Sequence, residues 1–197
     1  MMQKTLIRST VLFCLLALAA CVNLKPVPSQ TESFTLGPVD TTVTPEALAS
    51  GKPIYILRPQ MPTYQDGSRL NYRSASGEVT SLPGARWAEP LAEGIARATS
   101  LYLAASNQAS VEGYYPWPNT SREAARLSLN FQRFGATDSG EVKVVARWTL
   151  KKPGGKSQSG QFVSETLSWV PGQPETLVAA YNRALQALAE SLKDELI

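Results

Sequence analysis

Few residues of this chain have the chemistry to catalyse a reaction or to hold a metal ion. The 197-residue sequence contains no histidine and two cysteines, Cys14 and Cys21. Histidine is the commonest general base, the usual partner of a serine nucleophile and the commonest metal ligand. Its absence argues against most hydrolase and zinc chemistry. We predict no catalytic residues, no metal site and no cofactor. A periplasmic enzyme with an unrecognised carboxylate site, which would not need histidine, is the alternative.

Two short patterns resemble reactive motifs, and each has a simpler interpretation. Glu89 and Glu93 are four residues apart on a predicted helix, where they either form an acid/base pair or face solvent. Residues 155–157 read Gly-Lys-Ser, like the end of a phosphate-binding loop, but Leu150 stands where the first glycine must be. A strand is expected to follow instead of a helix, so we interpret these residues as the solvated tip of a hairpin.

Three lysines, Lys151, Lys152 and Lys156, surround the same predicted turn. A solvent-exposed hairpin explains them. Contact with lipid head groups or with an acidic partner is the alternative interpretation.

A short aromatic segment alternates with prolines, as Tyr114, Tyr115 and Trp117 are interleaved with Pro116 and Pro118. Rigid aromatic side chains are good anchors in protein interfaces. The three aromatic residues therefore either form a partner interface or cap the edge of a sheet over the core.

The first 20 residues are typical of an export signal. Lys4 and Arg8 precede a short apolar run that is about half the length of a membrane-spanning helix. The run ends in Leu18-Ala19-Ala20-Cys21, which resembles the bacterial lipobox. We expect acyl chains on Cys21 to replace the cleaved segment as the membrane anchor. The alternative is an ordinary signal peptide followed by a chance cysteine.

Processing also changes the charge of the chain. Removal of residues 1–20 leaves 17 basic and 16 acidic side chains, which gives no clustered basic surface for nucleic acid. Val22 and Asn23 follow the cysteine, and neither is the aspartate that resembles an inner-membrane retention signal. We expect anchoring in the outer membrane, facing the periplasm, with residues 21–32 as a tether of at most about 40 Å.

Residues 33–197 are expected to form one α/β domain. Short strands are predicted at 33–36 and 54–57, a hairpin at 69–82, and a helix from Arg86 or Trp87 to Asn107. A strand at 111–115 precedes three antiparallel strands at 127–131, 141–151 and 162–169. An amphipathic helix that Pro174 begins closes the chain. This order predicts a mixed, partly antiparallel sheet with two main helices.

Residues 85–91 carry a resemblance, because Ala-Arg-Trp-Ala-Glu-Pro-Leu resembles the signature of the ABC-type transport auxiliary lipoproteins, the PqiC-like family. The lipobox, residues 34–36, 69–73 and 127–134, and the closing helix from Glu175 fall in the family's order. Met61-Pro62 departs from the family's usual Leu-Pro pair. The likeness covers almost the whole mature chain.

The resemblance implies a three-layer α/β sandwich, similar to the amino-terminal domain of TolB. It also implies a non-catalytic subunit that acts with a mammalian-cell-entry (MCE) domain protein of an ABC-type system, moving phospholipid or related lipids between the two membranes. Within the signature Trp87, Glu89, Pro90 and Leu91, the tryptophan and leucine either anchor the helix on the sheet or contact the partner. A homo-oligomer is compatible with this fold. The alternative function is a lipoprotein activator or scaffold of cell-wall synthesis.

Overall fold

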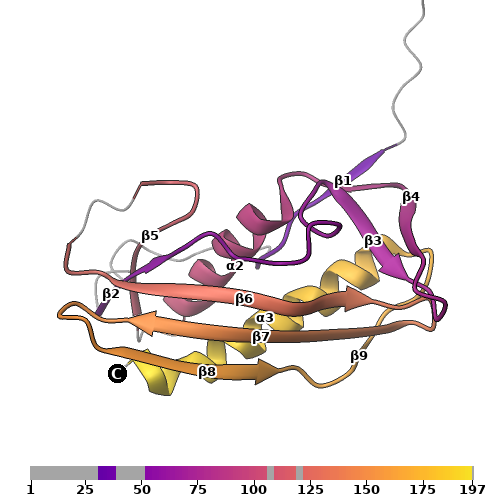
Figure 1. Ribbon diagram of the computed structural model, residues 1–197. Helices are drawn as coiled ribbons and strands as arrows, with labels where there is room; N and C mark the ends of the chain where they lie inside the picture. Colours follow the sequence, from indigo (N-terminus) through magenta and orange to yellow (C-terminus); the bar gives the residue numbers. More distant parts are fainter. Residues whose placement is uncertain (1–30, 39–51, 106–108, 119–121, 197) are drawn as a thin grey trace, which may run out of the picture. The chain divides into compact units, whose positions relative to one another are not determined.

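The computed structural model describes residues 31–38, 52–105, 109–118 and 122–196, and Thr31–Ile197 forms one compact unit. The predicted signal peptide, Cys21 and most of the tether lie outside the described residues. The described residues form two sheets and two helices (Figure 1). In chain order the elements are β1 (Glu32–Phe34), β2 (Lys52–Ile56), β3 (Arg69–Arg73), β4 (Val79–Trp87), α2 (Leu91–Ala105), β5 (Ala109–Tyr114), β6 (Ala125–Ala136), β7 (Glu141–Lys151), β8 (Ser157–Val163), β9 (Leu167–Ser168) and α3 (Pro174–Leu196).

The larger sheet has the strand order β5-β2-β6-β7-β8, and β9 pairs with β7. Strand β2 is parallel to both of its neighbours, whereas β6, β7 and β8 form an antiparallel meander. Apolar and polar residues alternate along β7, broken only by Val145, which explains why this strand is buried on one face and wet on the other. The predicted mixed sheet and the three-strand meander are confirmed.

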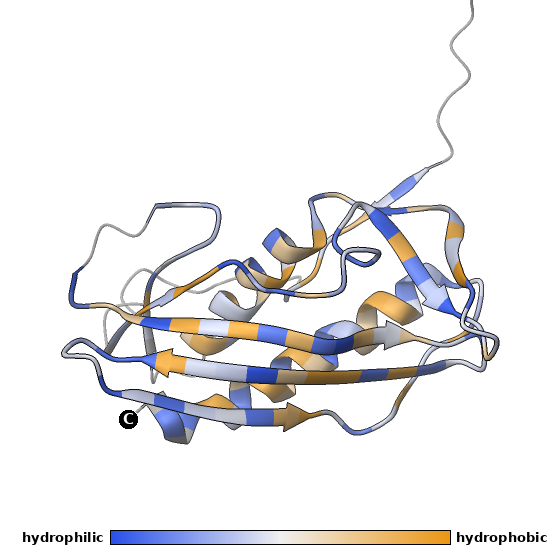
Figure 2. Cartoon of the chain, in the orientation of Figure 1, coloured by the Kyte–Doolittle hydropathy of each residue, from blue (hydrophilic) through white to orange (hydrophobic). Residues whose placement is uncertain are grey.

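Both helices lie on the apolar face of the larger sheet, behind the strands in the view of Figure 1. Helix α3 directs Leu177, Tyr181, Leu185, Leu188 and Leu192 into the core, as its helical spacing predicts. Figure 2 shows the same separation as apolar residues on the inner side of α3 and alternating colours along β6 and β7. The α/β class with two main helices is therefore confirmed.

The predicted helix start at Trp87 is wrong, because Trp87 is the last residue of β4 and α2 begins at Leu91. The Trp87 N–H donates to the Ser68 carbonyl at 2.7 Å, and the end of β4 pairs in parallel with β1. Pro90 then disfavours helical geometry at the residue before it. Its carbonyl accepts from the Glu93 and Gly94 N–H groups, which opens the helix.

Strand β4 also continues beyond the predicted end of the hairpin at Leu82. The β3–β4 register breaks between Arg69 and Asn71, where Pro83 and Gly84 are accommodated, and Gly84 has a positive φ of 70°. The smaller sheet therefore has the order β1-β4-β3, with β4 between a parallel and an antiparallel neighbour.

The third meander strand begins five residues earlier than the predicted Phe162, at Ser157. The strand also ends early, because the Ser164 hydroxyl accepts from the Val144 N–H at 3.0 Å, in place of a backbone carbonyl. This substitution interrupts the ladder before β9. The polar residues of β8 are tolerated because the strand forms an edge of the sheet.

Gly160 provides a test of this register. It lies opposite Trp148, and a Cβ on Gly160 would lie 2.6 Å from a ring carbon of that tryptophan. We expect Gly160→Ala to lower the free energy of unfolding by about 1–3 kcal/mol through overpacking, measured by urea denaturation. Ser159→Ala, on the same strand but exposed, should change it by less than about 0.5 kcal/mol. Equal stability of the two variants would contradict the packing of Trp148 over Gly160.

Candidate functional site

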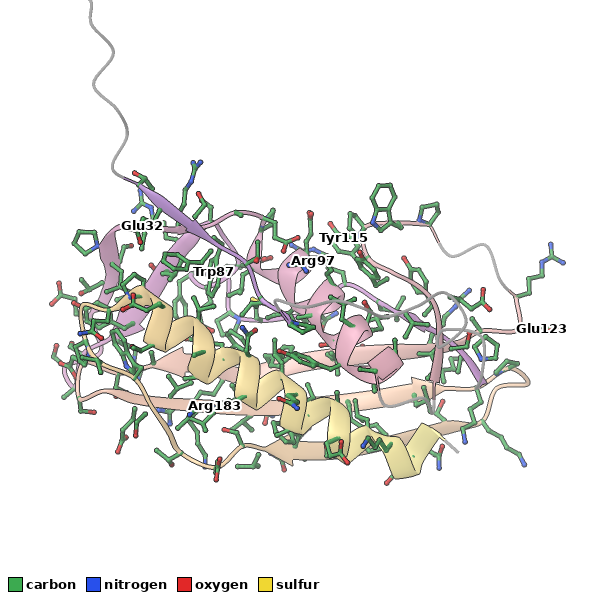
Figure 3. All side chains as sticks on the ribbon, turned by 180° about the vertical axis from the view of Figure 1, so that it is seen from behind. Glu32, Trp87, Arg97, Tyr115, Glu123 and Arg183 are labelled. Atoms are coloured by element: carbon green, nitrogen blue, oxygen red, sulfur yellow. The ribbon has the colours of Figure 1, made fainter. Side chains whose placement is uncertain are left out.

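Trp87 lies inside the core, where it joins the two sheets. It is 4% exposed, and its ring centroid lies 6.2 Å from that of Tyr181 on α3. Tyr181 in turn stacks on Phe134 of β6 at 4.3 Å, and Phe134 meets Phe131 edge to face at 5.3 Å. Figure 3 shows Trp87 between α3 and the strands. This placement favours the interpretation of Trp87 as a structural anchor.

Tyr181 lies in the middle of this aromatic chain. Burial raises the pKa of its hydroxyl well above the ordinary value, so the ring stays neutral. Leu91, at the first turn of α2, is 4% exposed and belongs to the same core. Two of the four signature residues therefore contribute buried contacts.

Glu89 lies before the helix and is part of an ion pair with Arg97 of α2. Arg97 Nη2 and Nε lie 2.5 Å and 3.1 Å from Glu89 Oε1, and both side chains are 27% exposed. Arg97 Nη2 also donates to the Leu36 carbonyl at 2.8 Å. Glu89 is therefore engaged by an arginine and does not form the acid/base pair with Glu93 that the sequence left open.

The same network fixes the segment that follows β1. The Gly37 N–H donates to Asn182 Oδ1 of α3 at 2.8 Å, and the Ala88 N–H donates to the Phe34 carbonyl at 2.8 Å. The chain that leads from the amino terminus is thus attached to both helices and to the end of β4. The signature residues hold this attachment in place.

The aromatic residues after β5 divide into two kinds. Tyr114 and Tyr115 are half-buried and pack against the core, as the capping interpretation expects. Trp117 is 64% exposed, whereas the other three tryptophans are at most 7% exposed. Trp117 is therefore the member of the set that is free to act as an interface anchor.

Tyr55 of β2 and the packing of Tyr115 hold the loop that carries Trp117. The Tyr55 hydroxyl donates to the Trp117 carbonyl, and the Tyr115–Pro116 peptide bond is cis. Arg58 lies over the Tyr115 ring, 5.5 Å from its centroid. The hydrogen bond from Arg58 to Asp66 raises the pKa of the guanidinium, which stays charged. The exposed indole is presented on a positioned backbone.

Two cavities beside these elements are lined without paired carboxylates. A groove of about 380 Å³ runs beside β3 and the end of β6, and Asp138 is the one carboxylate that lines it. A cavity of about 250 Å³ at Ile54, Leu150 and Pro153 is mainly apolar, with Glu123 and Lys152 in its lining. Within the described ranges, no group of acidic or cysteine residues could hold a metal ion, and no helix is long and apolar enough to cross a membrane.

Lys151, Lys152 and Lys156 lie on the β7–β8 hairpin, as predicted. The Lys152 N–H donates to the Lys156 carbonyl, which closes the turn. Arg97, which completes the network of Glu89, carried no recognised signal in the sequence. Helical spacing predicts Tyr181 in the core but not its contact with Trp87. Arg147 alternates with the apolar residues of β7, and the same alternation along β6 could have placed Arg126 on that face as well.

The family model described as ABC-type transport auxiliary lipoprotein component matches residues 34–193. This chain belongs to that family. The family is one of lipoproteins that are auxiliary components of ABC-type transport, so a role within a transport system and an attachment to a membrane follow from membership. No curated protein matches the chain.

Solved structures show a related fold at low identity. A crystal structure of an uncharacterized protein has a TM-score of 0.67 at 15% identity, over 85% of this chain and 99% of that one. Protein XCC0632 from Xanthomonas campestris has a TM-score of 0.60 at 16% identity, over 84% and 92% of the two chains. A more distant structure, the PelC dodecamer from Paraburkholderia phytofirmans, has a TM-score of 0.40 at 16% identity, over 83% and 95%.

The contrast between Trp87 and Trp117 can be tested by the same substitution at both positions. Trp87→Ala should lower the free energy of unfolding by about 3–5 kcal/mol, because it opens a cavity in the aromatic chain. Trp117→Ala should change it by less than about 0.5 kcal/mol, since the indole faces solvent. Both values are measured by urea denaturation. A stable Trp87→Ala protein would show that this ring does not join the sheets.

Proposed function

We propose that this protein is a lipid-anchored, non-catalytic subunit of an ABC-type system that moves phospholipid or related lipids between the inner and outer membranes with an MCE-domain protein. The observation that carries the proposal is the match of the transport auxiliary lipoprotein family to residues 34–193. The distribution of side chains supports it, since the signature residues are occupied in packing and the described cavities lack paired carboxylates. Such a subunit contributes to envelope integrity through binding alone.

The proposed anchor is Cys21, and the proposed address is the periplasmic side of the outer membrane. The lipobox at residues 18–21 and the absence of an aspartate after Cys21 support this assignment. Three acyl chains would hold the protein stably, whereas one holds a protein only marginally. The domain would then act within reach of a short tether.

The proposed partner surface is centred on Trp117. Tryptophan is enriched among the residues that dominate binding energy, and this one is exposed on a backbone that Tyr55 holds. Tyr114 and Tyr115 support the loop from the core side. We also propose that two copies of the chain can contact each other through an exposed aromatic surface such as the one at Trp117.

A site-specific crosslink tests the partner and the surface together. A photo-reactive benzoylphenylalanine at Trp117 in the anchored protein should capture an MCE-domain protein, identified by mass spectrometry. The matched control is the same group at Val170, which is also exposed (49%) but lies after β9. Capture from both positions would support the partner and contradict the surface. Capture of a cell-wall synthase would replace the transport proposal with the cell-wall alternative.

The anchor is tested by Cys21→Ala. Because residues 31–197 contain the whole described core, we expect a folded domain that moves from the membrane fraction to the soluble periplasm. Fractionation by ultracentrifugation and circular dichroism measure the two properties. A variant that still sediments with membranes would contradict lipidation at Cys21.

A further inference from the structure

The polar face of the larger sheet, on the side opposite the helices, has no covering element among the described residues. We call it the open face. Its central pairs are Arg126 with Lys151, Asn130 with Arg147, and Thr149 with Ser159. The residues that alternate with these along β6 and β7 point to the opposite, inner face of the sheet, where they are buried and apolar. Figure 1 shows the open face toward the viewer, and Figure 3 shows the helices on the other side.

Charge on the open face is predominantly positive. Strands β6, β7 and β8 contain one acidic residue, Glu141, and five cations. The cations are Arg126, Arg133, Lys143, Arg147 and Lys151. Three ion pairs of the described domain join Arg58 to Asp66, Arg97 to Glu89 and Lys193 to Glu190, and none of these three involves a cation of the open face.

The charge is also graded along the strands. Glu141 lies at one end of β7, where it pairs with Ser168, and Asp138 occupies the adjoining turn. At the other end Arg126 and Lys151 lie directly opposite each other, and Lys152 and Lys156 follow in the hairpin. Two cations that face each other across strands repel unless an anion lies between them. The arrangement favours an anionic surface as the occupant.

We propose that the open face docks on anionic phospholipid head groups of the membrane that holds the protein. A second copy is the poorer occupant, because two such faces would bring like charges together. Membership in a lipoprotein family keeps the domain near a bilayer, so a weak interaction operates at high effective concentration. Each cation near an anionic bilayer strengthens association about fivefold. Docking would orient the sheet along the membrane and place the helices away from it.

The orientation can be measured in the lipidated full-length protein reconstituted into vesicles. After cleavage at Cys21 and acylation no free thiol is expected, so one introduced cysteine can carry a fluorophore. Thr149→Cys places it on the open face, and Gln186→Cys places it on the exposed side of α3 as the control. Head-group spin-labelled lipid should quench the fluorophore at 149 and not at 186 in phosphatidylglycerol vesicles. Phosphatidylcholine vesicles, or 1 M salt, should abolish the difference.

Paired charge variants separate docking from anchoring. Arg126→Gln/Arg147→Gln should lower the ratio of docked to undocked protein about twenty-five-fold, as two cations are lost. Arg183→Gln/Lys193→Gln removes the same charge from α3 and should leave quenching unchanged. Vesicle flotation and mass spectrometry of the acyl chains check the anchor independently. Equal quenching at 149 and 186, or equal effects of the two double variants, would overturn the proposal and leave an acidic protein as the occupant.

Discussion

The contact of Trp87 with Tyr181 is the interaction on which the arrangement of this domain depends. No continuous ladder of backbone hydrogen bonds joins the two sheets in the described residues, where the bridge from β3 to the end of β6 is the isolated pair Arg73 and Thr137. A chain of four aromatic rings, Trp87, Tyr181, Phe134 and Phe131, instead connects β4, helix α3 and β6. Large rings bury much apolar area at low entropic cost, which suits them to this junction. The main structural role of Trp87 and Leu91 in the signature is therefore to pack the core.

The ion pair of Glu89 with Arg97 connects this core to the segment after β1. Arg97 reaches the Leu36 carbonyl, and Asn182 accepts from Gly37, so both helices hold the chain where it enters the domain. A protein anchored by its amino terminus transmits any pull through this segment. An attachment to two helices and to β4 distributes the force over the core. In the proposed state anchored at Cys21, the residues that would resist a pull on the tether are therefore the same residues that organise the fold.

The proposed binding functions depend on residues at the surface of the domain. The chain has a formal net charge of only +3, yet the structure separates its charges, with cations on the open face and the three ion pairs on other parts of the described domain. Trp117 is exposed in the loop that crosses Tyr55, and Tyr55 lies beside Arg126 in the register of β2 and β6. The proposed protein surface and the proposed lipid surface therefore adjoin. A subunit of this kind could hold a partner beside the bilayer without any catalytic group.

Composition and local pattern were sufficient to predict the α/β class, the meander and the amphipathic last helix, because each depends on residue type and short-range periodicity. The same kind of pattern predicts the export signal and the lipobox, and the lack of histidine argues against most hydrolase and zinc chemistry. Tertiary structure decided that Trp87 lies in a strand and that Ser157 begins one. Trp87 has helical spacing with Leu91, but pairing with β1 and the bond to Ser68 keep it in a strand. Ser157 to Gly160 lack apolar alternation and become a strand because β7 offers an unpaired edge. Partners distant in the chain supply these hydrogen bonds, and no local pattern contains them.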